Sequence, residues 1–444
     1  MALSVQELPQ TVMAAVWNPV VFAWTDSDIT TYNLTDYKFE FEVFYRVDSN
    51  DAYVSTGIFQ LYPDTTGTAY FDVSRILQNF MESDFRYNVS GFDTVNPQQC
   101  IQYKVNLYRD YVQTGVRHYE FLTTFPDGAK VFDAAVSLNE YNQWDIITDD
   151  IMTGFPVQIK RPISNVPTGL KLNRNEWYTL QLMPYHPIFG GSLWIKTMVV
   201  TTYDINGLQK IFIKTRTNDT DVSKQFMAVG IGPANLTALG IGPNVSESQG
   251  WSINYGAFPV FDDQVVYYTV EFYLQDDTTL AVPTITVMFD QDWCTYRGND
   301  KYWLVYKNKL GGYSWLKFEA KMYKSVKVVK EQYQKKVDFK KMLTSGGKYL
   351  RGDTSVGNDI QEKYTLNSEY ANVSEQDFFE ELIVSPSVFM LKPINNLGND
   401  EVINDVIPVS ISDSTYTILK KNTVNLVQYT IEVIAALPKN VQRQ

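Results

Sequence analysis

The feature that most constrains the fold is a set of short runs in which aromatic and β-branched residues alternate with polar ones. Residues 37–45 and 265–274 are two clear examples, and comparable runs recur from residue 17 to residue 434. Successive side chains of a strand point to opposite faces of a sheet, so such runs suit strands that have one buried face. The sequence therefore predicts a chain built almost entirely of β-strands.

We predict a mainly β protein made of several tandem β-sandwich domains, Ig-like or jelly-roll-like, with a few short helices. A chain of 444 residues is too long for a single core and most naturally forms two to four domains. Turn-rich segments and changes of pattern suggest four: an N-terminal β-sandwich at 1–125, a second β domain at 126–255, a third β domain ending in a lysine-rich strand at 256–345, and a loop, short helix and C-terminal β region at 346–444.

Two short helices are expected among the strands. The first follows Phe71, with Asp72 or Ser74 as its cap, and would cover a sheet edge with Ile76, Leu77, Phe80 and Met81. The second runs from Ser374 to Leu382, with Phe378 and Leu382 one turn apart on its apolar side.

Turns and loops are predicted from Gly, Pro, Asn and Asp. The segments 63–67 and 309–313 have the composition of tight turns. Residues 344–372 lack periodicity and are expected to form a long loop. From Leu316 to Val328 the apolar residues fall on even positions, which predicts a strand with one wet face.

The chemical inventory is thin. Two His and two Cys in 444 residues leave little for a metal centre or an acid–base relay, His118 and His186 stand alone, and the chain has no Gly-X-Ser-X-Gly elbow. We therefore expect no enzyme activity, no metal and no cofactor. Cys100 and Cys294 are interpreted as reduced, buried small hydrophobes of a protein made in a cytosol.

Several motifs have a functional and a structural interpretation. Acidic pairs occur at 149–150, 262–263 and 276–277. They could bind calcium in a loop or, if they converge in space, act as a glycosidase carboxylate pair, although turn composition explains them better. The segment 230–236 starts like a dinucleotide fingerprint but lacks the third glycine, and its Ile-Gly-Pro triplet, repeated at 241–243, is interpreted as exposed turns. The Arg-Gly-Asp string at 351–353 and the Asn-X-Ser/Thr triplets are attributed to chance.

Charge and hydropathy limit the partners. A net charge of −12 argues against nucleic-acid binding by the whole molecule, and no apolar run approaches the roughly 18 residues needed to cross a bilayer, so no membrane insertion is expected. The first residues lack the pattern of a Sec-type signal.

One segment departs from this acidic balance. Ten lysines against three acidic residues give 317–348 a charge of +7. This segment is either a patch that docks onto an acidic neighbour or a solvated ribbon whose lysines discourage edge pairing. The candidate partner-interface residues are Lys321, Lys324, Lys327, Lys330, Lys335, Lys336, Lys340 and Lys341.

Segments spread over most of the chain resemble the large virion proteins of tailed bacteriophages that infect Bacteroidetes. They are the Asn18–Phe22 strand, the 63–77 turn and helix, the Tyr302–Tyr313 hairpin, the segment 382–390 and the closing 427–433 strand with its Gln442-Arg-Gln444 tail. These are structural motifs without catalytic residues. The resemblance implies a component of the virion, made in the bacterial cytoplasm, at the tail tip or baseplate or in a head or tail fibre.

The residues and the resemblance lead to three functional hypotheses. The first is a structural subunit that forms a symmetric homo-oligomer and contacts other virion proteins through aromatic and β-edge surfaces. The second is a fibre protein that binds host surface glycans through aromatic loops. The third, a glycan-degrading enzyme, would need one of the acidic pairs to converge.

Overall fold

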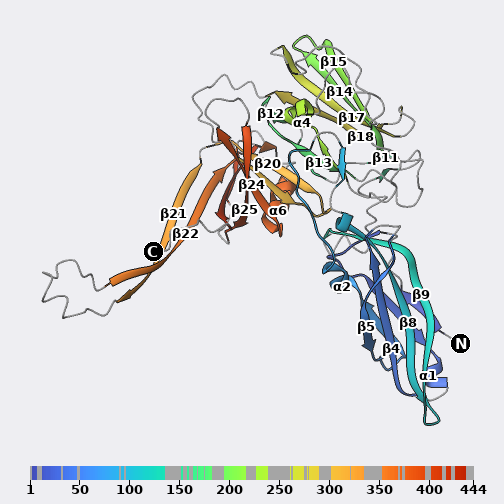
Figure 1. The fold of residues 1–444 in the computed structure, drawn as a ribbon. Coiled ribbons are helices and arrows are strands. Elements are labelled where there is room, and N and C mark those ends of the chain that lie inside the picture. Colours follow the sequence, from blue (N-terminus) through green and yellow to red (C-terminus); the bar gives the residue numbers. More distant parts are fainter. Residues whose placement is uncertain are drawn as a thin grey trace, which may run out of the picture. The chain divides into compact units, whose positions relative to one another are not determined.

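The structure is a computed structural model of the chain (Figure 1). It describes residues 3–7, 13–31, 34–47, 51–89, 92–94, 97–135, 152–153, 158–159, 164–167, 169–174, 176–182, 195–216, 227–238, 261, 264–274, 278, 280–289, 302–320, 322–334, 353–368, 371–372, 376–395, 402–412, 417–421 and 426–436. The chain divides into two compact units. The first is Met1–Asp292 with Asn308–Ser314, and the second is Trp293–Lys307 with Trp315–Gln444.

The first unit begins with a two-layer β-sandwich. One layer has the order β1 (Leu3–Glu7), β3 (Val21–Asp26), β6 (Thr68–Asp72). The other has the order β2 (Met13–Ala15), β9 (Val116–Phe132), β8 (Cys100–Gln113), β4 (Thr35–Arg46), β5 (Val54–Leu61). Strand β2 pairs with β9 in parallel, and the other neighbours are antiparallel. The predicted mainly β, sandwich-like fold is confirmed.

The aromatic alternation of β4 builds the core of this sandwich. Phe39, Phe41 and Val43 are fully buried, and they share the inner side of the strand. The ring of Phe41 lies 4.4 Å from that of Phe71 and 5.1 Å from that of Trp24, both on the opposite layer. Burying each such side chain stabilises the fold by about 1.5–3 kcal/mol. The residues that predicted a strand are therefore also the ones that hold the two layers together.

The turn predicted at 63–67 joins β5 to β6. Gly67 has a φ of +83°, and a Cβ there would lie 3.1 Å from the carbonyl oxygen of Asp26. The Asp64 carboxylate accepts hydrogen bonds from the hydroxyl of Thr66 and from the backbone N–H of Thr66 and Thr68. These bonds, led by the Thr66 hydroxyl, lower the pKa of Asp64.

Helix α2 (Ser74–Gln78) lies where the sequence predicted it, but its cap differs. Leu77 is buried, and the other three apolar residues predicted for this helix pack partly buried against the sandwich core. The N-cap is Val73, which makes no side-chain cap hydrogen bond. The Asp72 carboxylate instead accepts from the N–H of Val20 and of Ser74, so it joins the end of β6 to the start of β3.

The rest of the first unit contains three further sheets. A five-stranded sheet has the order β12 (Leu170–Leu172), β18 (Leu280–Phe289), β17 (Val265–Leu274), β14 (Ile195–Asp204), β15 (Gln209–Arg216). A three-stranded sheet has the order β13 (Thr179–Leu182), β16 (Met227–Gly230), β7 (Phe92–Thr94), and β10 (Met152–Thr153) pairs with β11 (Gln158–Ile159). The short helical elements are α1 (Asp28–Thr31), η1 (Pro97–Gln99) and α4 (Pro233–Ala238).

The Ile-Gly-Pro triplet at 231–233, where α4 begins, is buried, so the prediction of an exposed turn was wrong there, and the repeat at 241–243 lies outside the described residues. Asn235 is fully buried, and its side-chain oxygen accepts the N–H of Tyr178 at 2.8 Å. Its amide nitrogen donates to the carbonyls of Tyr87 at 3.0 Å and Val89 at 2.7 Å. A Cβ at Gly230 would lie 2.1 Å from the Val89 carbonyl oxygen. Close backbone packing explains this glycine, since β16 lies in an antiparallel sheet and no βαβ unit is formed.

The second unit is built on a nine-stranded sheet. Its order is β20 (Tyr313–Phe318), β19 (Tyr302–Lys307), β24 (Val388–Asn395), β25 (Val402–Ile411), β27 (Leu426–Ala435), β22 (Asp353–Asn367), β21 (Tyr323–Gln334), and both β23 (Ala371–Asn372) and β26 (Thr417–Lys421) pair with β27. Helix α6 (Gln376–Val384) packs on it. Phe379 and Leu382 are buried, and the Phe379 ring stacks on Tyr429 at 4.1 Å. The sequence had assigned Phe378 to this role, one residue too early.

Two further predictions for this unit were wrong. Most of the expected loop at 344–372 is strand β22, in which Tyr364 and Leu366 are buried. The expected continuous strand at 316–328 is broken, since β20 ends at Phe318 and β21 begins at Tyr323. The predicted hairpin turn between β19 and β20 is confirmed, with Gly311 at a φ of +82°.

Strands pair across the ends of the four segments expected from the sequence. Strand β9 continues through residue 125, and β7 of the N-terminal segment pairs with β16. Strands β14 and β17 pair on either side of residue 255, and β21 and β22 pair on either side of residue 345. Turn composition marks where the chain reverses, but a reversal inside a sheet looks the same as a domain end. The exact domain ends stay predictions.

Candidate functional site

Three of the eight lysines predicted to face a partner lie on strand β21. Lys324 forms an ion pair with Glu362 of β22 at 2.9 Å, and its ammonium lies 5.2 Å from the centre of the Tyr364 ring. Lys327 is exposed, and Lys330 pairs through its backbone with Asn358. The other five, Lys321, Lys335, Lys336, Lys340 and Lys341, lie outside the described residues. Their part in an interface stays a prediction.

Strands β21 and β22 form a ribbon that extends beyond the sheet. They pair from Tyr323 to Gln334, whereas β22 pairs with β27 only from Lys363 to Asn367. Figure 1 shows the two strands running out side by side from the rest of the sheet. Each residue from 323 to 328 is exposed, so neither side of this part of β21 is covered. Val326 and Val328 are 51% and 47% exposed.

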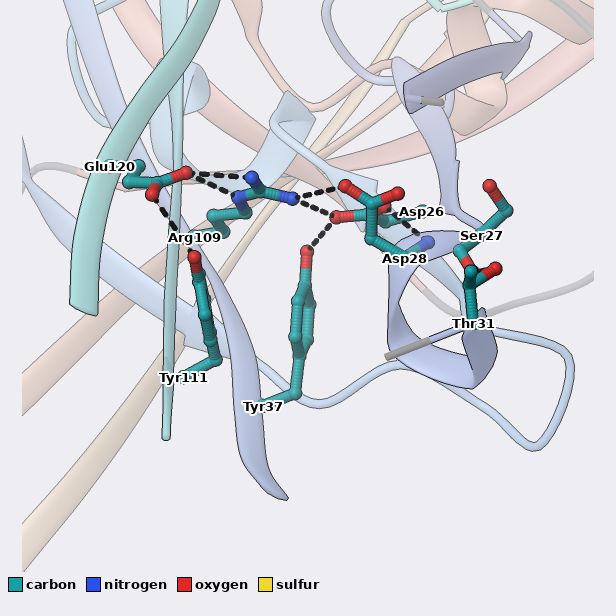
Figure 2. Close-up of polar contacts among 8 residues, drawn as sticks. All are labelled: Asp26, Ser27, Asp28, Thr31, Tyr37, Arg109, Tyr111 and Glu120. Carbon is teal, nitrogen blue, oxygen red and sulfur yellow. Dashed lines mark hydrogen bonds and ion pairs between the residues drawn. The ribbon is translucent and has the colours of Figure 1, made fainter. Parts of the chain in front are cut away.

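A second cluster of charged residues centres on Arg109, at an inward position of β8. Its guanidinium lies between carboxylates from three elements (Figure 2). One nitrogen, Nη1, is 2.9 Å from Asp26 at the end of β3 and 3.1 Å from Asp28 of α1. Nε and Nη2 bind Glu120 of β9 at 2.8 and 2.7 Å. The Arg109 side chain is 8% exposed and that of Asp26 is 1% exposed, so this is a buried ion cluster.

Two tyrosines complete the cluster. The Tyr37 hydroxyl donates to Asp26 at 2.6 Å, and the Tyr111 hydroxyl donates to Glu120 at 3.0 Å. Burial, helped by Asp26, strongly raises the pKa of Tyr37. Burial acts to lower the pKa of Arg109, but its hydrogen bonds to the carboxylates outweigh burial and raise that pKa. The cluster joins β3, α1, β4, β8 and β9 through buried hydrogen bonds, which suits a structural role at this end of the sandwich.

The outer side of the five-stranded layer carries a group of aromatic residues. The ring of Tyr108 lies 5.3 Å from that of Tyr119 and 5.4 Å from that of Phe121. Tyr119 and Phe121 are 54% and 57% exposed. Glu42 lies beside them on β4, where its carboxylate accepts from the Ser55 and Tyr108 hydroxyls. We call Tyr108, Tyr119, Phe121 and Glu42 the outer aromatic face.

Burial and nearby carboxylates shape the ionisation of this face. Burial raises the pKa of Tyr119 to about 12, with the charge of Glu40 as the next cause. Asp110 forms ion pairs with Arg117 at 2.6 Å and Lys38 at 3.2 Å, and these bonds, led by Arg117, lower the pKa of Asp110. The phenol of Tyr119 is therefore neutral near pH 7, and the Asp110 carboxyl is charged.

The sandwich is expected to lose stability in acid. The pKa of Asp110 is lowered by Arg117, and that of Glu120 is lowered by Arg109. A carboxyl with a lowered folded-state pKa stabilises the fold fully above its unfolded value of about 4. This stability disappears as the pH falls through the lower folded-state values. Replacing Asp110 by Asn should clearly lower the urea concentration at which the N-terminal sandwich itself unfolds at pH 6, and the difference from wild type should shrink towards pH 2.5. A difference that does not change with pH would contradict this.

His118 and Cys100 are the other chemical candidates that lie within the described residues. His118 stacks on Tyr111 at a ring distance of 5.1 Å. Cys100 is a free, buried thiol whose pKa is raised by burial to about 12. Cys294, His186, the three acidic pairs and the first two residues of the Arg-Gly-Asp string lie outside the described residues.

Within the described ranges, no group of three or more His, Cys, Asp or Glu side chains is arranged to hold a metal ion. No helix in these ranges has the length and apolarity to cross a membrane.

The Arg109 cluster was not among the sites predicted from the sequence. The sequence does contain a signal for a buried charge at Arg109. Alternate residues of β8 point inward, and Arg109 continues the spacing of Ile101, Tyr103, Val105 and Leu107. A charged residue at an inward position of a strand requires a partner. Its partners at 26, 28 and 120 could not be identified, since no local pattern links them.

The comparisons with known proteins give little. No protein-family model matches the chain, and no curated protein matches it. Among solved structures, the crystal structure of trypsin-activated alpha-2-macroglobulin from Escherichia coli is similar with 7% identity and a TM-score of 0.20. That alignment covers 97% of this chain and 32% of the other, so the chain spans about a third of the length of that protein.

Proposed function

We propose that this chain is a structural subunit of a tailed-bacteriophage virion, and that it forms a symmetric homo-oligomer at the tail tip or baseplate. The observation that carries the proposal is that several large apolar side chains lie exposed on strands of the described part of the chain. Phe121 and Tyr119 lie exposed on a sheet side, and Val326 and Val328 lie exposed on a ribbon. Exposed apolar patches of this kind mark interaction sites, and aromatic residues concentrate binding energy in interfaces.

The absence of converging chemistry in the described residues also favours an assembly role over catalysis. Charged side chains there are used in internal ion pairs, as in the buried cluster around Arg109. The segments that resemble virion proteins supply the phage assignment.

The assignment to a particle is tested by locating the chain in purified phage. Mass spectrometry of virions should detect it in stoichiometric amounts, and a reconstruction of the particle should contain density into which both units fit. Absence from the virion would contradict the proposal. Hydrolysis of capsular polysaccharide by the purified chain, abolished by mutating one acidic pair, would also overturn it.

A second candidate function is binding of host surface glycans, as in a head or tail fibre. The outer aromatic face favours it, because aromatic rings beside a carboxylate can pack on sugar rings and accept hydrogen bonds from their hydroxyls. A glycan array should then give a signal that Phe121→Ala abolishes, with Tyr70→Ala as the control because Tyr70 is 61% exposed on the other layer. An unchanged signal would exclude this face.

A further inference from the structure

Three cations lie together on the outer side of the five-stranded layer of the sandwich. The strand register places Arg46 of β4, Gln102 of β8 and Lys130 of β9 side by side, and Lys104 lies two residues further along β8 on the same side. The guanidinium Nε of Arg46 donates to the side-chain oxygen of Gln102 at 2.8 Å. We call Arg46, Lys104 and Lys130 the basic cluster.

Aromatic rings lie against two members of this cluster. The centre of the Tyr53 ring is 4.4 Å from the guanidinium carbon of Arg46 and 4.5 Å from the ammonium of Lys104. The same ammonium is 5.1 Å from the centre of the Phe44 ring. A ring face attracts a cation but leaves its charge uncompensated. Both cations therefore keep the capacity to bind an anion.

Carboxylates occur on this side of the layer, but they are paired with other cations. Asp110 forms ion pairs with Lys38 and Arg117, and Glu40 forms one with Lys38. Among the described residues, no carboxylate forms an ion pair with a member of the basic cluster. The cluster is therefore a local concentration of positive charge on a chain whose net charge is −12.

Lys130 has the strongest physical reason to bind an anion. It is half-buried, and none of the described side chains accepts a hydrogen bond from its ammonium. Burial lowers the pKa of Lys130, and the charge of Arg46 adds to this effect, whereas Cys100 opposes it. The Cys100 thiol has a pKa of about 12, so it is neutral near pH 7 and does not compensate the lysine. A bound anion would offset the cost of burying this cation.

The basic cluster and the outer aromatic face lie on the same side of β8. Lys104 and Tyr108 are four residues apart on that strand, which corresponds to about 13 Å. Asn106 lies between them, and its side-chain oxygen accepts the hydroxyl of Thr124 at 2.8 Å. This side of the strand thus presents a cation, an amide and an aromatic ring in a row. Amides and aromatic rings of this kind bind the hydroxyls and the ring faces of sugars.

We propose that this side of the sandwich binds an acidic polysaccharide, with an anionic group of one sugar on the basic cluster and further sugar rings on the outer aromatic face. The inference rests on the second candidate function, glycan binding, and names the class of glycan. A nucleic acid is a weaker fit, because Glu42 and the net charge of the chain repel a polyphosphate.

Titration calorimetry of the full-length chain with an oligogalacturonate tests this. We expect the wild type to bind it, with an affinity that falls as salt is added and is at least tenfold higher than that for a neutral maltooligosaccharide of equal length. Lys104→Gln with Lys130→Gln should weaken the binding at least tenfold. The matched control is Lys171→Gln with Lys327→Gln, which makes the same change of charge at two exposed lysines and should bind as the wild type does.

Several results would overturn the inference. They are a wild type that does not bind the oligogalacturonate, a double variant that binds as well as the wild type, and an equal loss in the control variant. Tighter binding of a random DNA duplex or of an oligoglutamate would identify another class of polyanion. Binding of free sulfate as tight as that of the oligosaccharide would show that sugar rings contribute nothing.

A measurement on the wild type covers the case in which the double variant does not fold. Acetylation of lysines, followed by mass spectrometry, should show that the oligogalacturonate protects Lys104 and Lys130 but leaves Lys171 reactive. Equal reactivity with and without the oligosaccharide would contradict the site. Binding of a neutral glycan that Phe121→Ala abolishes and the double variant retains would support the second candidate function and overturn this inference. Detection of the chain in the virion is independent of all these results.

Discussion

Replacing Arg109 by Met is expected to destabilise the N-terminal sandwich by about 3–5 kcal/mol, the usual cost of removing one partner from a buried ion pair. The change leaves Asp26, Asp28 and Glu120 without their common cation, and the first of these is 1% exposed. Hydrogen exchange at increasing urea, followed on peptides from β4 and β8, measures this local free energy. A whole-chain melt is less suitable, because a chain with two units does not unfold in two states.

The matched control for this change is Arg117→Met. Arg117 also binds a carboxylate on the same sheet, but its side chain is 59% exposed. Its loss should cost far less than that of Arg109, because solvent screens an exposed ion pair. The loss of stability in Arg109→Lys should fall between the losses of the two methionine variants. The lysine keeps the positive charge, but its single ammonium group cannot reach the carboxylates on both sides that the planar guanidinium binds. Equal effects of the two methionine variants would show that burial does not govern the strength of the cluster.

Replacing Asn235 by Asp is expected to cost about 3–5 kcal/mol and to lower the soluble yield. The change alters one atom, but the carbonyls of Tyr87 and Val89 lose their donor and face an oxygen in a fully buried site. Each buried polar group left without a partner costs about 1–3 kcal/mol, and a buried charge costs more. Hydrogen exchange on peptides that include β13 and β16 measures the loss.

The control is Asn206→Asp, the same chemical change in the exposed turn between β14 and β15. The backbone N–H of Asn206 donates to the Asp204 side chain, and its own side chain lies in the exposed part of the turn. Its replacement should stay within about 0.5 kcal/mol of wild type. A similar loss for both variants would mean that burial of Asn235 does not matter.

The strands with one buried side could be predicted from the sequence, because burial imposes the alternation. In β4, β8 and β17, the inward positions carry the apolar residues, and the structure places those residues in the core. Strand β22 was missed for the same physical reason. Over much of its length it pairs only with β21, and its sequence there has no apolar period to detect.

The candidate surfaces could be predicted only in part. The charge of 317–348 was evident from composition, whereas the position of three of its lysines on a projecting ribbon depends on the pairing of β21 with β22. The outer aromatic face joins residues of β4, β8 and β9. Pairing registers of this kind follow from the whole fold, and no short segment encodes them.

The buried side chain of Asn235 links the order of synthesis to the order of folding. The carbonyls that it binds, at Tyr87 and Val89, leave the ribosome 148 and 146 residues earlier, and the N–H of Tyr178 leaves it 57 residues earlier. Closing such long loops is slow. A nascent chain can therefore complete its first sandwich early, but its residues near 87–89 have to wait for α4 before their carbonyls are satisfied.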